Sequence, residues 1–134
     1  MSWFLSLSLT FVAGAIGGLA NALVVWFFGI KGIKQFFKVN IAPKLDVLFI
    51  YSKIVWGGLW GVLFIFALDP QSLFLKATLI SLAPTLVQLF YIFPKQGLGT
   101  SGLKLGSLTP ALVIFFNLVW AYAGATWIYF ALLK

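Results

Sequence analysis

The chain has 134 residues, of which 63% are hydrophobic and 8% are charged, and its formal net charge is +7. A soluble domain carries about 25% charged residues, so this composition predicts an integral membrane protein. The sequence has no cysteine and no histidine, which excludes disulfides, thiolate chemistry and imidazole metal sites.

The apolar residues divide into four runs of about 20 residues or more, the length of helix that crosses a hydrocarbon core. We therefore predict an all-α polytopic membrane protein, a four-transmembrane-helix bundle that forms a single domain over 1–134. The predicted spans and loops are 3–29, a basic loop at 30–43, 44–68, 70–93, a flexible glycine-rich loop at 94–106, and 107–133.

The first two spans carry small residues at every fourth position. In the first span these are Gly14, Gly18 and Ala22, and in the second Gly57 and Gly61 follow Lys53 at the same spacing. Residues four apart share one face of a helix, and a stripe of small residues allows a neighbouring backbone to approach closely. We expect these two faces to pack inside the bundle.

The third span begins with a helix-start signal. Asp69 followed by Pro70 is typical of a capping carboxylate and a first helical residue, and predicts a short turn between packed antiparallel spans. Pro84 in mid-span frees a backbone carbonyl and predicts a kink. The fourth span has small residues for packing, namely Ala121, Gly124 and Ala125.

The second and fourth spans also resemble each other. Residues 54–68 align without gaps on 118–132 with five identities, which include Trp56 with Trp120. A real duplication predicts two parallel hairpin repeats, a repeat type found in transporters, while shared apolar composition alone also accounts for the matches. The alignment places Asn117 opposite Lys53.

The lysines predict the orientation of the chain. Six of them lie in or beside the two long loops, whereas Lys76 and Lys134 flank the opposite side. By the positive-inside rule, both long loops are cytoplasmic and both termini lie outside, and we expect a bacterial inner membrane.

Each span contributes one strongly polar side chain at a similar depth. At about 1.5 Å per residue, these side chains lie roughly 8 to 13 Å below the cytoplasmic boundary. They are Asn21, Lys53, Gln88 and Asn117. They form a predicted layer with two interpretations: interhelical hydrogen bonding, with Lys53 snorkelling to the headgroups, or a site for a small anion or the acidic group of a ligand.

The sequence thus predicts a small non-catalytic membrane protein with no metal, no cofactor and no nucleic-acid partner. Asp46 and Asp69 are expected near opposite faces of the membrane, so they cannot act together as a general acid and a general base. The first hypothesis is an accessory or structural subunit of a larger membrane complex, or a homo-oligomer, because the glycine faces exceed what four helices need. The alternative is a small anion channel or carrier that uses the polar layer.

Overall fold

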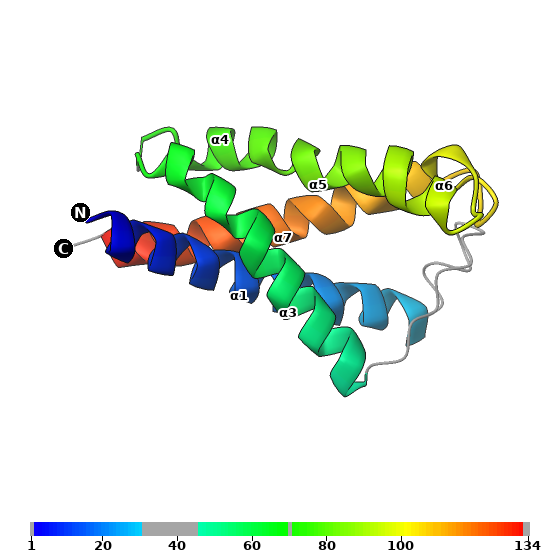
Figure 1. Cartoon of the computed structure of the whole chain (residues 1–134), viewed down its shortest axis with the longest axis horizontal. Coiled ribbons are helices and arrows are strands. Elements are labelled where there is room, and N and C mark those ends of the chain that lie inside the picture. Colours follow the sequence, from blue (N-terminus) through cyan, green and yellow to red (C-terminus); the bar gives the residue numbers. More distant parts are fainter. Residues whose placement is uncertain (1, 31–45, 70, 133–134) are drawn as a thin grey trace.

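The computed structural model describes residues 2–30, 46–69 and 71–132, and this part of the chain is all-α (Figure 1). Its elements are α1 (Trp3–Ile30), α3 (Val47–Gly61), η1 (Val62–Ala67), α4 (Leu73–Ile80), α5 (Leu82–Val87), η2 (Gln88–Ile92), α6 (Phe93–Lys95), η3 (Thr100–Gly102) and α7 (Thr109–Leu132). Here η1 and η3 are 3-10 helices and η2 is a π-helix. Consecutive elements join into four apolar spans, each long enough to cross a membrane, which confirms the predicted all-α fold and the four spans.

Two helix starts differ from the predicted boundaries. Helix α3 begins at Val47, where the Asp46 carboxylate accepts a 2.8 Å hydrogen bond from the Phe49 amide. Helix α4 begins at Leu73, because the Asp69 carboxylate bonds within the turn, to the amide of Gln71 at 3.2 Å, and does not cap a helix. Most of the predicted basic loop at 30–43, together with residues 70 and 133, lies outside the described residues.

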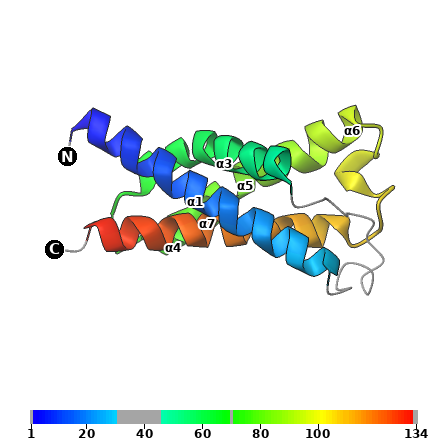
Figure 2. The same cartoon turned by 90° about the horizontal axis from the view of Figure 1, so that it is seen from below.

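Helix α1 crosses both α3 and α7 (Figures 1 and 2). The beginning of α1 and the end of α7 lie at the same end of the molecule, and the loop that contains η3 lies at the other (Figure 1). We call these the terminal end and the loop end.

The crossing of α1 and α3 is built from glycines. A methyl group added at Gly61 would lie 2.5 Å from Cα of Gly14, and one added at Gly57 would lie 2.9 Å from Cα of Gly18. These distances leave no room for a side chain, so the two backbones touch, as a small-xxx-small interface requires. The structure thus places both predicted stripes against each other, and Ala22 is fully buried in the same helix.

The second and third spans diverge from each other. Helix α3 packs mainly against α1, whereas α4 and α5 pack mainly against α7. The two spans meet where η1 packs against α4, beside the short turn, and then separate towards the loop end (Figure 1). The predicted antiparallel hairpin is therefore packed only near its turn.

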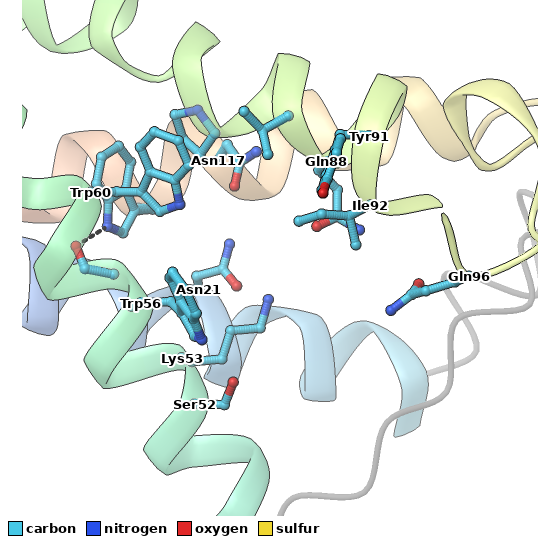
Figure 3. Close-up of a pocket in the computed structure, with 15 residues that line it drawn as sticks. Asn21, Ser52, Lys53, Trp56, Trp60, Gln88, Tyr91, Ile92, Gln96 and Asn117 are labelled. Atoms are coloured by element: carbon cyan, nitrogen blue, oxygen red, sulfur yellow. Dashed lines mark hydrogen bonds between the residues drawn. The ribbon is translucent and has the colours of Figure 1, made fainter. Parts of the chain in front are cut away.

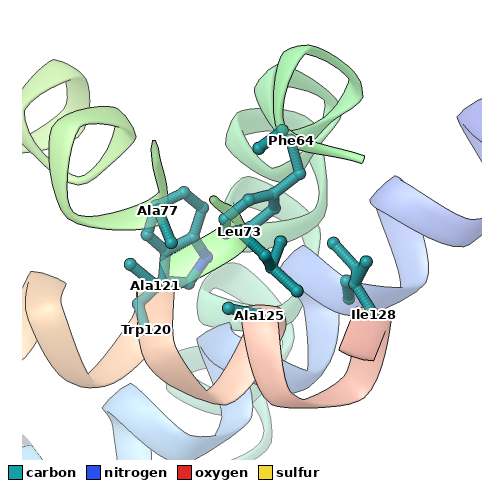
Figure 4. Packing of buried hydrophobic residues seen from close by; sticks show 9 residues of the cluster. Phe64, Leu73, Ala77, Trp120, Ala121, Ala125 and Ile128 are labelled. Atoms are coloured by element: carbon teal, nitrogen blue, oxygen red, sulfur yellow. The ribbon is translucent and has the colours of Figure 1, made fainter. Parts of the chain in front are cut away.

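The hydrophobic core fills the terminal end of the bundle (Figure 4). Its largest members are Phe64, Leu73, Trp120 and Ile128, and the rings of Phe64 and Trp120 stack with centroids 5.2 Å apart. The small residues predicted for the fourth span take part in this packing. Ala121 and Ala125 are fully buried, and a methyl group at Gly124 would lie 3.0 Å from the Ala13 carbonyl oxygen.

The glycine-rich loop at 94–106 follows a hydrogen-bonded, packed path in the structure, and its expected flexibility stays a prediction. The Leu98 amide donates to the Phe93 carbonyl at 2.9 Å, and the Lys104 amide donates to the Leu98 carbonyl at 3.1 Å. Leu98 and Leu105 pack on the buried residues at the loop end. The loop's glycines supply the positive φ angles that such a tight path needs, as at Gly102 with φ +67°.

Candidate functional site: a cavity between α3 and η2

A cavity of about 590 Å³ lies between α1, α3, α5, η2 and α7 (Figure 3). A smaller cavity of about 300 Å³ adjoins it towards the loop end. Both cavities are lined by all four side chains of the predicted polar layer, Asn21, Lys53, Gln88 and Asn117. Further polar side chains at the larger cavity are Ser52 and Gln96, and its aromatic walls are Trp56, Trp60, Tyr91 and Trp120.

Lys53 is the cation of the cavity. Its Nζ lies 5.7 Å from the centre of the Phe49 ring and points into the open space (Figure 3). Among the described residues, Lys53 makes no ion pair with a carboxylate. The carboxylate of Asp46, on the same helix, instead caps the start of α3. The positive charge therefore faces the cavity without a counter-ion from this part of the chain.

Asn21 presents a hydrogen-bond acceptor with no partner. Its Nδ2 donates a 2.8 Å hydrogen bond to the Phe116 carbonyl oxygen. Because a carbonyl can only accept, this bond determines which end of the amide is nitrogen and leaves Oδ1 free of Phe116. Asn21 is 5% exposed, and Oδ1 has no hydrogen-bond partner in the described structure. A buried acceptor without a donor is costly, so this atom is suited to a ligand group that donates.

The remaining two amides differ in how they are used. The Nδ2 of Asn117 donates to the Thr85 hydroxyl at 2.9 Å, and Thr85 in turn donates to the Ser81 carbonyl at 2.7 Å. This chain joins α7 to α5, so the hydrogen-bonding interpretation describes Asn117 well. The side-chain amide of Gln88 makes no hydrogen bond within the described ranges and stays available to the cavity.

The π-helix η2 brings three residues to the cavity wall, Gln88, Tyr91 and Ile92. The irregularity begins upstream, where the third span is interrupted at Ser81, between α4 and α5. Pro84 has no amide to donate to the carbonyl four residues before it, which gives a local reason for this interruption, and the predicted kink stays a prediction. A π-helical turn inside a helix is rare and is frequent at functional sites.

Trp120 forms the floor of the cavity and belongs also to the terminal-end core. Its indole Nε1 donates to two backbone carbonyl oxygens, of Gly14 at 3.1 Å and of Gly57 at 3.3 Å. Below this floor the bundle is filled by apolar side chains.

Sequence reasoning missed several residues of the cavity wall. Trp56 and Trp60 lie three and seven residues after Lys53, so helical periodicity could have placed them on its face. Gln96 is the C-cap residue of α6 and lies eight residues after Gln88, a spacing that helical periodicity places on one face. The predicted repeat stays a prediction. The two tryptophans that it aligns differ in environment, because Trp120 is 3% exposed and Trp56 is 60% exposed.

The groups at this site offer charge, hydrogen bonds and apolar surface to a ligand. The described residues contain no group of three or more His, Cys, Asp or Glu side chains that could hold a metal ion. The lysine and the two amides with unpaired side-chain groups can hold an anionic group. The indole rings beside them can hold an apolar group. No protein-family model, curated protein or solved structure matches the chain.

Proposed function

We propose that this membrane protein is a non-enzymatic binding protein or carrier that holds a ligand with an anionic group in the cavity between α3 and η2. The observation that carries the proposal is Lys53, whose Nζ points into a cavity of about 590 Å³ with no carboxylate paired to it in the described chain (Figure 3). An anion in this low-dielectric site is attracted far more strongly than in water.

The amide groups support an anionic ligand. Gln88 has an unpaired amide at the same cavity, and an amide NH₂ can donate to an anion beside the ammonium. A charge inside a membrane span is costly and marks a functional site by default. Its position here, beside three amides from three other spans, therefore supports a ligand-binding role.

The packing favours a binding site or carrier over an open channel. Trp120 closes the cavity towards the terminal end, where Phe64, Leu73 and Ile128 fill the bundle. An anion crossing the bundle by this route would have to pass through apolar side chains that offer no hydrogen bonds. Transport in this protein would thus need a conformational change, as in a carrier.

An accessory subunit or a homo-oligomer is less well supported than the sequence suggests. That hypothesis depended on glycine faces left over for a partner. In the structure, Gly14 and Gly18 pack on α3, Gly17 packs on Trp120, and Gly124 packs on Ala13 and Phe64. Each of these glycines is used within the chain, so none of them calls for a second protein.

The proposal is tested by calorimetric titration of the purified protein in an uncharged detergent. The probes are acetate, inorganic phosphate, glycerol 3-phosphate and dodecyl phosphate, which share a negative charge and differ in size and apolar length. We expect saturable binding of at least one probe. Lys53→Met should weaken it at least about tenfold, because a hydrogen bond to a charged group contributes about 1.5–3 kcal/mol.

Lys76→Met is the matched control, since Lys76 also lies in an apolar span but does not line the cavity. This variant should bind as the unmodified protein does. Both variants should keep the circular dichroism spectrum of a helical protein and elute from a size-exclusion column at the volume of the unmodified protein, which shows that they are folded. Absence of binding by all four probes, or equal binding by the Lys53→Met variant, would contradict the proposed function.

A further inference from the structure

The cavity is open on the side that a surrounding bilayer would contact. Its two walls, α3 and η2, belong to the spans that diverge from each other. The span that contains α3 packs mainly on α1, and the span that contains η2 packs mainly on α7. Trp56 on α3 is 60% exposed and Tyr91 on η2 is 58% exposed, although both line the cavity. Because these residues lie within membrane-spanning helices, an opening between them leads into lipid rather than into water.

The lining of the cavity is divided by polarity. Lys53, Asn21 and Gln88 provide the polar groups, and Gln96 extends them towards the loop end (Figure 3). Beside these polar groups, the indoles of Trp56 and Trp60 on α3 form an apolar part of the cavity wall. Indole and phenol rings combine an apolar face with one polar group, which suits the boundary between a head group and a chain.

The size of the cavity also exceeds what a small ion requires. Cavities of about 300–1,000 Å³ hold ligands of many atoms. A halide or acetate at Lys53 would leave most of the 590 Å³ unfilled. A head group with the first part of an alkyl chain would occupy both the polar groups and the indole walls.

We propose that the ligand is a membrane amphiphile with an anionic, hydroxyl-bearing head group, which enters from the bilayer between α3 and η2. Its negative charge lies beside the Lys53 ammonium, its hydroxyl donates to the unpartnered Oδ1 of Asn21, and its chain leaves past Trp56 and Tyr91. This inference depends on the proposed function and adds the class of ligand and its route.

The experiment measures which lipids stay bound when the protein is released from mixed micelles in a native mass spectrometer. The unmodified protein is equilibrated with equal amounts of phosphatidylcholine, phosphatidylglycerol and phosphatidylmethanol that have the same chains. Phosphatidylglycerol carries both the charge and the hydroxyl, and phosphatidylmethanol carries the charge alone. We expect retention to fall severalfold from phosphatidylglycerol to phosphatidylmethanol and again to phosphatidylcholine.

Two variants test the contacts. Lys53→Met should abolish the preference for the anionic lipids, and Lys76→Met should keep it. Tryptophan fluorescence of the unmodified protein gives a second measurement. Phosphatidylglycerol with brominated chains should quench more emission than brominated phosphatidylcholine does, and Trp56→Phe should reduce that difference.

Equal retention of the three lipids would overturn the inference. Equal retention of the two anionic lipids would overturn the role of Asn21. Glycerol 3-phosphate, the soluble head group without chains, separates this inference from the proposed function. If it binds as tightly as the lipid and competes with it fully, the ligand is a soluble anion and the proposed function stands. If neither binds, both proposals fail.

Discussion

The indole nitrogen of Trp120 lies 3.1 Å from the carbonyl oxygen of Gly14 and donates a hydrogen bond to it. The same N–H lies 3.3 Å from the Gly57 carbonyl, so one side chain of α7 contacts the glycine crossing of α1 and α3. This close contact is possible because Gly17 has no side chain: a methyl group there would lie 2.8 Å from Cδ1 of the Trp120 ring. Three of the four spans therefore meet at this residue, between the cavity and the apolar core.

Trp120→Phe should lower the free energy of unfolding by about 1 kcal/mol, because hydrogen bonds between membrane helices contribute about 0.6–1.7 kcal/mol and most of the ring packing is retained. Denaturation by sodium dodecyl sulfate in mixed micelles measures this difference. Trp127→Phe is the control, since Trp127 is 46% exposed and forms no hydrogen bond through its side chain in the described structure. Equal effects of the two substitutions would show that the bonds of Trp120 contribute nothing.

Gly14→Ala should destabilise the bundle by about 1–3 kcal/mol or more, because overpacking of a close contact costs that much. The added methyl group would lie 2.5 Å from Cα of Gly61, a backbone atom that cannot move aside alone. Leu79→Ala, on the exposed side of α4, should change stability much less, since it exchanges one contact with lipid for another. The same denaturation assay compares the two variants, and equal tolerance would mean that α1 and α3 do not cross at these glycines.

Gly102→Ala should be more harmful than Gly97→Ala if the loop at 94–106 is folded as described. Both glycines have positive φ, at +67° and +78°, so both substitutions carry the same backbone penalty of about 1–2 kcal/mol. Only Gly102 is enclosed, with Phe93 ring atoms 2.6 Å and Thr109 Cγ2 2.9 Å from an added methyl group. Thermal denaturation should separate the variants by several degrees, and identical midpoints would indicate an unpacked loop.

The orientation predicted from the lysines is tested by single cysteines, because the natural chain has none. A cysteine at Thr100, which is exposed at the loop end, should react with an impermeant maleimide only from the cytoplasm. A cysteine at Ser2, exposed at the terminal end, should react only from outside. The reverse result would place the polar layer near the outer boundary of the membrane.

Local patterns predict the four apolar spans of this fold and the four polar positions that line its cavity. Four apolar runs of sufficient length predict four helices, because a membrane-spanning backbone must satisfy its own hydrogen bonds. Asn21, Lys53, Gln88 and Asn117 were found by depth and by helical face, since strongly polar side chains avoid lipid. The prediction of a kink at Pro84 also depends on a single local cause, its missing amide.

Contacts between distant segments decided the rest. Nothing local states that α3 packs on α1 while α4 and α5 pack on α7, because that choice depends on how glycine and alanine surfaces fit together in space. This divergence leaves the cavity between α3 and η2, and the entry from lipid that we infer depends on it. The fold of the glycine-rich loop, the two hydrogen bonds of Trp120 and the unpartnered Oδ1 of Asn21 likewise depend on atoms far apart in sequence. Hydropathy and helical period determined which residues enter the bundle, and steric fit between helices determined what they meet there.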